Sequence, residues 1–331
     1  MRTIPTGAVL ATVMGVMIFG QSLAGPKQWQ SEWPKTDFTK HLVPYEEIMS
    51  GGVRKDQIPS IDKPEFMAVG AVAAAEGLAP TEPVVGLTVN GTARAYPLSV
   101  LIWHEIVNDV IAGVPVAVTF CPLCNAAVAF DRRVDGRTLE FGTTGKLRHS
   151  DLVMYDRQSE SWWQQFTGQA IVGEMLGQEL RFLPARLESF AKFKARAPEG
   201  QVLVPNNADL RRYGMNPYYG YDSANAPFLY RGKMPGVVAP LARVVAVGDQ
   251  AWSVDFLQIK QRIETPDGLI LTWERGQNSA LDSTVIAEGR DVGNVLVQRR
   301  DGNGKLVDAL YRVDFAFAFH AFYPDAKITV E

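Results

Sequence analysis

The chain has 331 residues, of which 47% are hydrophobic and 21% are charged, and its net charge is −3 at pH 7. These values describe a folded globular protein and exclude a disordered or collagen-like chain. Its Lys and Arg residues are scattered, without a basic run, so we expect no nucleic-acid partner.

Residues 1–24 have the features of a secretory signal. Arg2 precedes an apolar stretch that runs from residue 4 to residue 19, and Ser22 and Ala24 are small residues at the two positions that signal peptidase reads. The sequence therefore predicts cleavage after Ala24 and a periplasmic or secreted protein, or a membrane-anchored one if the signal stays uncleaved. No later segment is apolar over the roughly 18 residues of a membrane span, so we expect no integral membrane domain after cleavage.

After this signal, a polar segment leads into one β-rich domain. Prolines interrupt residues 25–60, which show no sustained periodicity; this predicts an extended N-terminal arm laid over the domain, with a short helical turn near residues 46–52. Residues 61–331 are predicted to form a single β-rich domain. The aromatic-rich segment 206–236 could divide this domain into two lobes, because connections of this length usually bind or cover something.

Strand and turn signals dominate residues 61–331. Asn90-Gly91 and Asp135-Gly136 each lie between apolar runs, which is the strongest short-range signal of a β-hairpin. Two helices are predicted, at residues 99–109 with Ser99 as N-cap and at residues 188–198, and we find no internal repeat. The predicted fold class is mainly β with a few short helices (α+β), in an antiparallel sandwich or partly closed barrel. Further strands are predicted at residues 152–155, 170–172, 179–183, 202–204, 244–247, 251–257, 259–264, 269–273, 294–299 and 312–319.

The two cysteines of the chain, Cys121 and Cys124, lie in the motif "TFCPLCNAAVAF". A thioredoxin-type pair needs a helix directly after the first cysteine to lower its pKa, whereas here a predicted strand enters and a predicted strand leaves. Because export allows a disulfide to persist, a structural disulfide between Cys121 and Cys124 is a second possibility.

A metal site suits this turn better, because two thiolates between strands can face one ion. His104 and His149 are the histidines closest in sequence, and they are the candidate third and fourth ligands; His41 and His320 are weaker candidates. Two thiolates with imidazole would bind copper or zinc, and thiolate softness slightly favours copper. The motif "HEIVN" begins like a zinc-protease helix, but Asn108 replaces the second ligand, so a protease is not predicted.

The densest polar stretch of the sequence runs from residue 141 to residue 173. Within it, Arg148, Asp156, Arg157 and Trp162 could line a pocket for an anionic or sugar-like ligand, with paired hydrogen bonds from the arginines and a flat face from the tryptophan. The alternative is structural: Asp156 and Arg157 form an ion pair that fixes a turn, and the tryptophans belong to the core. No nucleophile elbow surrounds Ser161, so a hydrolase of that type is not predicted.

With these motifs laid out, the chain resembles the bacterial domain-of-unknown-function family 3179, whose members are uncharacterised exported proteins with a CPLC motif. The resemblance rests on "YPLSVLIWHEIVND", "VTFCPLCNAAVAFDRRVDG", "FGTTGKLRHSDLVMYDRQSESWWQQFTGQAIVG" and "FAFHAFYPDAKI", and it covers the chain from about Ala68 to the end. No activity is assigned to the family, so the resemblance implies a shared pocket but no reaction. The matched motif positions include His104, Glu105, Cys121, Pro122, Cys124, Asp156, Arg157, Trp162 and Gly168.

The leading hypothesis is an exported protein in which Cys121, Cys124 and His104 bind copper or zinc, with His149 as a further ligand. One alternative is a protein that binds a small ligand or a partner protein, with a structural disulfide between the cysteines beside the pocket of Arg148. Another is a thiol-disulfide oxidoreductase. Whether the protein is an enzyme is left open.

Overall fold

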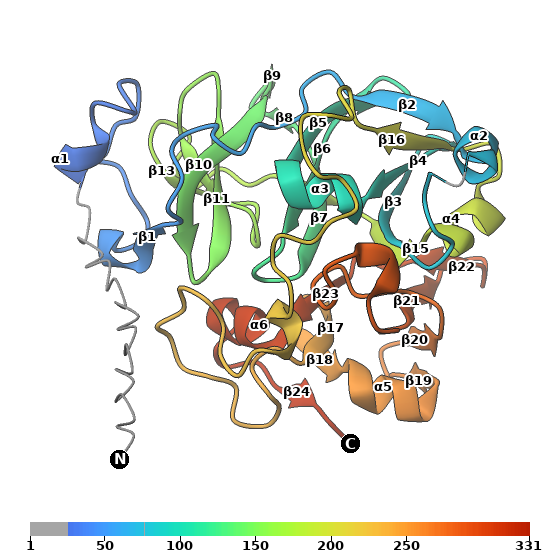
Figure 1. The fold of residues 1–331 in the computed structure, drawn as a ribbon. Helices are drawn as coiled ribbons and strands as arrows, with labels where there is room; N and C mark the ends of the chain where they lie inside the picture. The colour runs from blue at the N-terminus through green and yellow to red at the C-terminus, as the bar shows by residue number, and fades with distance from the viewer. Residues whose placement is uncertain (1–25, 76) are drawn as a thin grey trace, which may run out of the picture.

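The computed structural model describes residues 26–75 and 77–331, so the predicted signal at residues 1–24 lies outside the described residues. The protein is mainly β with short helices, as predicted from the sequence (Figure 1). The two predicted hairpins are also confirmed, since Val89 pairs with Thr92 and Val134 with Arg137. No helix among the described residues is long and apolar enough to cross a membrane.

The first part of the fold consists of two sheets joined by a helix. One sheet has the strand order β15-β3-β4-β16-β2 and the other has the order β14-β7-β6-β5. All their pairings are antiparallel except that of β4 with β16. Helix α3 (Leu98–His104) leads from β4 to β5. The other elements are β2 (Glu65–Ala68), α2 (Val69–Ala74), β3 (Pro83–Val89), β4 (Thr92–Pro97), β5 (Ile106–Ile111), β6 (Val114–Cys121), β7 (Ala126–Asp131), β14 (Arg181–Leu183), β15 (Ala185–Ser189), α4 (Phe190–Arg196) and β16 (Gln201–Val204).

A third sheet is inserted in the sequence between β7 and β14. Its order is β1-β10-β11-β12-β13, and β1 comes from the N-terminal arm, which therefore pairs with this sheet. Aromatic side chains from the arm and from the sheet fill a core of their own. The elements are α1 (Pro26–Trp29), η1 (Tyr45–Glu47), β1 (Ile48–Ser50), β8 (Arg133–Val134), β9 (Arg137–Thr138), β10 (Phe141–Arg148), β11 (Asp151–Asp156), β12 (Trp162–Gln164) and β13 (Ala170–Val172).

The last part of the chain forms two further sheets, seen in orange and red in Figure 1. Their orders are β23-β17-β18-β24 and β19-β20-β21-β22. The elements are β17 (Arg243–Val247), β18 (Gln250–Ser253), α5 (Val254–Lys260), β19 (Arg262–Glu264), β20 (Leu269–Glu274), η3 (Ile286–Glu288), β21 (Asn294–Arg300), β22 (Leu306–Asp308), β23 (Arg312–Phe315), α6 (Ala316–Phe322) and β24 (Ile328–Thr329).

These two sheets repeat the architecture of the first pair. The order β23-β17-β18-β24 corresponds to β15-β3-β4-β16, with two antiparallel pairings followed by a parallel one in both sheets. The registers agree as well, since Val84 pairs with Pro97 and Val244 with Ser253. In each half a seven-residue helix, α3 or α5, then leads to the second sheet. The molecule therefore contains one structural unit twice.

The expectation that the chain has no internal repeat is thus wrong. In the first copy the inserted third sheet separates β7 from β14, so the spacing of equivalent strands differs between the copies. Side chains also differ: "RLESFAKFKARAPEGQVLV", residues 186–204, corresponds without a gap to "RVDFAFAFHAFYPDAKITV", residues 312–330. What the two stretches share is their pattern of strand, helix, turn and strand.

Three predictions of local structure are also wrong. The segments 251–257 and 312–319 were expected to be strands, yet they contain the starts of α5 and α6. The alternation in "AFAFHAF" suggests a period of two, but residues 316–319 of α6 are all buried, and a helix without a polar face shows no helical period. The helix predicted over residues 99–109 is shorter, because Glu105 (φ 59°) ends α3 and a strand begins at Ile106; its N-cap is Pro97 and not Ser99.

The two copies of the unit pack against each other in a symmetric way. Strand β23 of the second copy lies against β7 of the first, and the equivalent strand β15 lies against β21. The backbone N–H of Phe315 donates to the carbonyl of Cys124 (2.9 Å), and that of the equivalent Ser189 donates to Oδ1 of Asn294 (2.7 Å). The turn that carries both cysteines therefore lies where the two copies meet.

Residues 205–242 connect the two copies, from β16 to β17, with one short 3₁₀-helix, η2 (Tyr221–Ser223). Most of this segment is irregular, and it runs in yellow over the front of the molecule in Figure 1. Tyr213, Tyr218, Tyr221 and Tyr230 pack their rings against the main core. The connection thus covers part of the first copy.

Candidate metal centre

Cys121 and Cys124 stand at the two ends of the tight turn between β6 and β7. The N–H of Cys124 donates to the carbonyl of Cys121 (3.3 Å), and the N–H of Asn125 donates to that of Pro122 (3.2 Å). The Asn125 side chain anchors the turn to the second copy by donating to the carbonyl of Val313 (2.9 Å). Both cysteines are free and buried. The turn thus presents two thiols from one rigid segment.

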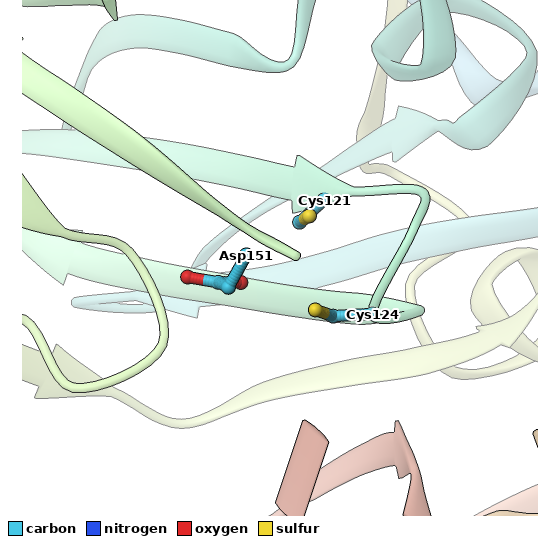
Figure 2. A group of neighbouring side chains, drawn as sticks. All are labelled: Cys121, Cys124 and Asp151. Carbon is cyan, nitrogen blue, oxygen red and sulfur yellow. The ribbon is translucent and has the colours of Figure 1, made fainter. Parts of the chain in front are cut away.

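The carboxylate of Asp151 completes a group with these two thiols. The sulfur atoms of Cys121 and Cys124 and a carboxylate oxygen of Asp151 all lie within 4.8 Å of one another. Figure 2 shows the carboxylate beside both sulfurs. Asp151 is the first residue of β11, and it follows a turn in which His149 (φ 54°) and Ser150 (φ 68°) have left-handed backbone conformations.

Neighbouring groups orient Asp151 but leave part of its carboxylate without a partner. Oδ1 accepts hydrogen bonds from Nε2 of Gln164 (2.7 Å) and from the N–H of Phe166 (3.0 Å). Oδ2 is buried and has no hydrogen-bond partner among the described residues. A buried oxygen in this state is costly unless a proton or a cation satisfies it.

The group lies in a region of buried acids. Burial raises the pKa of Asp151 to about 7 and that of Glu105 to about 8, in the latter case with a contribution from the charge of Asp151. Burial also raises the pKa of both thiols and of Asp314. Arg312 donates from Nε to Oδ2 of Asp314 (3.1 Å), while Oδ1 of Asp314 has no partner among the described residues. The Arg312 guanidinium therefore acts on Asp314 and Asp151, and a bound cation would stabilise the charged forms of the remaining acidic groups as well.

The predicted ligand His104 is not part of this group. Its Nδ1 lies 2.7 Å from the carbonyl of Pro59, and its Nε2 lies 2.8 Å from the hydroxyl of Tyr213, so both ring nitrogens already have partners. His104 sits near the end of α3 and links it to the arm and to the connecting segment. Its two hydrogen bonds therefore give His104 a structural role.

His149 is close in sequence to Asp151, but the structure does not bring its ring into the group either. Its Nε2 lies 3.4 Å from a carboxylate oxygen of Glu47, and its ring packs edge-on against Phe322. Of the four predicted metal ligands, the structure brings together Cys121 and Cys124.

Sequence reasoning did not single out Asp151 as a ligand. The available signal was an aspartate opening the apolar strand "DLVMY". No spacing rule connects it to the cysteines.

The two predicted ligand-binding arginines are occupied by acidic partners. Arg148 forms an ion pair with Glu47 (2.7 Å) from the arm. Arg157 pairs with Asp56 and Asp62, both at 3.1 Å, from the segment that follows β1. These arginines therefore attach the N-terminal arm to the third sheet.

Asp156 and Trp162 also have structural roles. Oδ1 of Asp156 accepts from the N–H of Ser159 (2.6 Å), which fixes the turn after β11, and Oδ2 accepts from the indole of Trp163 (2.9 Å). Trp162 is fully buried, and its ring packs against Trp29 of the arm (5.0 Å between centroids). The structural alternative describes this polar stretch better than a ligand pocket does, although Asp156 and Arg157 are not paired with each other.

A pocket of about 540 Å³ borders the Cys-Cys-Asp group. Glu105 lies in its wall, together with Leu123 from the cysteine turn and Leu152 from the strand of Asp151. Tyr221 closes one side by donating from its hydroxyl to the carbonyl of Leu123 (3.0 Å). The remaining lining residues are Gly51, Val53, Ile58, Gly145, Lys146, Leu147, Pro217, Tyr218, Tyr219, Gly220, Ala224 and Phe228.

Comparison with known protein families places the chain in one of them. A family model described as "Protein of unknown function (DUF3179)" matches residues 55–326, which include the cysteine turn, Asp151, Glu105 and both copies of the repeated unit. This match confirms the resemblance drawn from the sequence motifs. No curated protein and no solved structure matches the chain.

Proposed function

The chain belongs to the DUF3179 family, for which no activity is described, and we propose that it binds one soft metal ion, zinc in preference to copper, through Cys121, Cys124 and Asp151. The observation that carries the proposal is the convergence of two sulfurs and one carboxylate oxygen within 4.8 Å. In a tetrahedral zinc site, with Zn–S of about 2.3 Å and Zn–O of about 2.0 Å, two sulfurs and one oxygen lie about 3.5–3.8 Å apart. Small side-chain movements would bring the three atoms to these distances.

The hydrogen bonds around Asp151 support the same proposal. Metal-bound carboxylates are usually held in place by donors on the oxygen that does not bind the ion. Gln164 and the backbone of Phe166 donate to Oδ1, and Oδ2 is left with its lone pairs free. This is the arrangement expected of an oriented monodentate ligand.

The ligand set changes the preferred metal. The sequence slightly favoured copper, because thiolates are soft ligands and the protein was expected to be exported. A carboxylate is a hard ligand that suits zinc, whereas copper(I) favours thiolate, thioether and imidazole. Three protein ligands also leave a fourth position for water or for a bound molecule, which is the pattern of zinc sites that are not purely structural.

The rival functions receive less support. A thiol-disulfide oxidoreductase needs an accessible thiol of low pKa, but burial raises the pKa of Cys121, whose exposed fraction is only 2%, and a strand follows the motif. A structural disulfide remains the main rival, because the two sulfurs are close enough to be joined by a modest rotation. Titration of thiols under denaturing conditions separates the two states: two thiols before reduction favour the metal site, and none favours the disulfide.

Zinc stoichiometry tests the proposal. We expect about one zinc per chain after purification without chelators, and loss of that zinc in Cys121→Ser and Asp151→Asn. His149→Gln is the matched control, because His149 is next to the site but is not a proposed ligand; it should retain zinc. A parent protein without stoichiometric metal, or a Cys121→Ser/Cys124→Ser variant that keeps zinc, would refute the proposal.

We also propose export as the cellular context of the site. The support is the signal-like sequence of residues 1–24. N-terminal sequencing of the protein recovered from the periplasmic fraction should begin at Gly25, and an intact Met1 in the soluble cytoplasmic fraction would contradict export.

A further inference from the structure

The backbone role of Glu105 does not require a carboxylate. Glu105 ends α3 with a positive φ of 59°, its N–H donates to the carbonyl of Leu101 (2.7 Å), and its carbonyl accepts from the N–H of Phe120 (2.8 Å). These bonds join the helix to the strand β6 that carries Cys121. They involve only main-chain atoms.

The second copy of the unit shows that glutamine serves the same role. Gln261 ends α5 with a φ of 61°, its N–H donates to the carbonyl of Leu257 (2.7 Å), and its carbonyl accepts from the N–H of Trp273 (3.0 Å). The geometry matches that of Glu105 bond for bond. Because the fold accepts an amide at the equivalent position, the carboxyl group of Glu105 needs another explanation.

The Glu105 side chain lies in the wall of the pocket of about 540 Å³. Only 8% of the residue is exposed, and its carboxylate has no hydrogen-bond or salt-bridge partner among the described residues. Asp151 and Cys121 are near enough for their charged forms to interact with that of Glu105. This part of the pocket wall is therefore acidic and poorly hydrated, and no basic group of the described chain pairs with it.

The rest of the pocket wall is aromatic and apolar. Tyr218 and Tyr221 are half-buried, and Tyr219 and Phe228 stand exposed at the mouth. The cation that lines the pocket is Lys146, whose Nζ lies 3.6 Å from a carboxylate oxygen of Glu32 in the N-terminal arm. Lys146 thus has its own counterion and does not neutralise Glu105.

We propose that this pocket binds a small organic cation, an alkylammonium group on an apolar body, with the ammonium directed at Glu105. Aromatic faces attract such cations, and the attraction increases when water is excluded. A neutral apolar ligand would leave the buried carboxylate without a partner, and an anion would be repelled by it. The pocket lies beside the proposed metal site, but it is formed by different side chains.

Choline is the probe that tests the charge requirement, with 3,3-dimethylbutan-1-ol as its uncharged isostere and 3,3-dimethylbutanoate as an anion of similar shape. Titration calorimetry on the zinc-loaded chain should give an affinity for choline at least about tenfold higher than for the alcohol, and no binding of the anion. Equal affinities for choline and the alcohol, tighter binding of the anion, or no binding of choline would each overturn the proposal.

Two variants assign the binding to this pocket. Glu105→Gln should weaken choline binding at least about tenfold while the affinity for the alcohol stays the same, and the chain should fold because Gln261 already occupies the equivalent position. Tyr218→Leu should weaken choline binding through loss of an aromatic face. Glu199→Gln is the control, since Glu199 is an exposed acid in the turn after α4. Unchanged choline affinity in Glu105→Gln would place the cation elsewhere.

The same samples separate this proposal from the metal proposal. Zinc content is measured in every preparation, and choline is also titrated into the Cys121→Ser/Cys124→Ser variant. Choline binding that depends on Glu105 in a parent protein purified without stoichiometric zinc would support the cation pocket and refute the metal site. Zinc binding without a preference for choline over the alcohol would support the metal site and refute the cation pocket.

Discussion

Asp151 is the residue on which zinc affinity should depend most, after the cysteines. Replacing it with asparagine keeps the acceptor for Gln164 and Phe166 but removes the charged ligand atom. We expect Asp151→Asn to weaken zinc binding at least about tenfold, with little change in secondary structure. Competition with a chromophoric chelator measures this, and an unchanged affinity would exclude Asp151 as a ligand.

The same carboxyls should make the metal-free protein sensitive to alkaline pH. Their pKa values in the fold, about 7 for Asp151 and about 8 for Glu105, lie above the ordinary values of 3.8 and 4.5. The folded chain therefore binds more protons than the unfolded chain at neutral pH, and the free energy of unfolding falls as pH rises through these values. Burial lowers the pKa of His104 and His149, which has the opposite effect, but only below about pH 6.5.

Urea unfolding in the presence of a chelator checks this pH dependence. Between about pH 6.5 and about pH 8.5 we expect the metal-free protein to lose roughly 1 to 3 kcal/mol of stability. Saturating zinc should reduce or reverse the loss, because the ion stabilises the deprotonated ligands. A metal-free protein that becomes more stable over this range would contradict the buried acidic centre.

At the scale of elements, the third sheet supplies the ligand Asp151 from β11, and its strand β12 supports the N-terminal arm. Trp162 contacts Trp29, Trp33 and Phe38, so it joins β12 to the N-terminal arm. We expect Trp162→Ala to lower the free energy of unfolding by about 3 to 5 kcal/mol, as large-to-small changes in a core do. Zinc affinity should stay the same under conditions in which the variant is fully folded. Denaturant titration measures the stability of the variant, and chelator competition measures its zinc affinity. A fall in zinc affinity with unchanged stability would instead show that Trp162 acts directly on the metal site.

Local signals in the sequence were enough to predict some elements. The turn at Asn90-Gly91 and helix α4, which begins at the cap Ser189, depend on nearest neighbours in the chain. Helix α6 could not be predicted in this way, because tertiary burial on all sides removes the amphipathic pattern. The strand-to-strand setting of Cys121 and Cys124 was predicted correctly, since both residues lie in one short turn between two apolar runs.

At the scale of the whole molecule, the site depends on contacts between distant segments that no local sequence pattern predicts. Asp151 enters from a sheet inserted into the first copy of the unit, and Arg312 and Asp314 enter from β23 of the second copy. The order of the strands, and not the spacing of motifs, brings them beside the cysteines. Because the unit is repeated, Gln261 occupies the position equivalent to Glu105 and shows that this backbone position accepts an amide side chain.

The two copies share one main core, which predicts how the molecule responds to cleavage between them. Buried residues of both copies, from Val85 to Phe317, belong to the same hydrophobic cluster. We expect a chain cut by a protease site inserted at the exposed residues 207–209 to stay associated and to elute at the size of the intact protein. Separation of the fragments without denaturant would show that the copies are independent domains.

X-ray absorption at the zinc edge of the loaded protein tests the central claim most directly. Two sulfur atoms at about 2.3 Å, together with oxygen at about 2.0–2.2 Å and no outer-shell scattering from imidazole, is the result that we predict. A first shell without sulfur, or one that contains imidazole from His104 or His149, would contradict a site built from Cys121, Cys124 and Asp151.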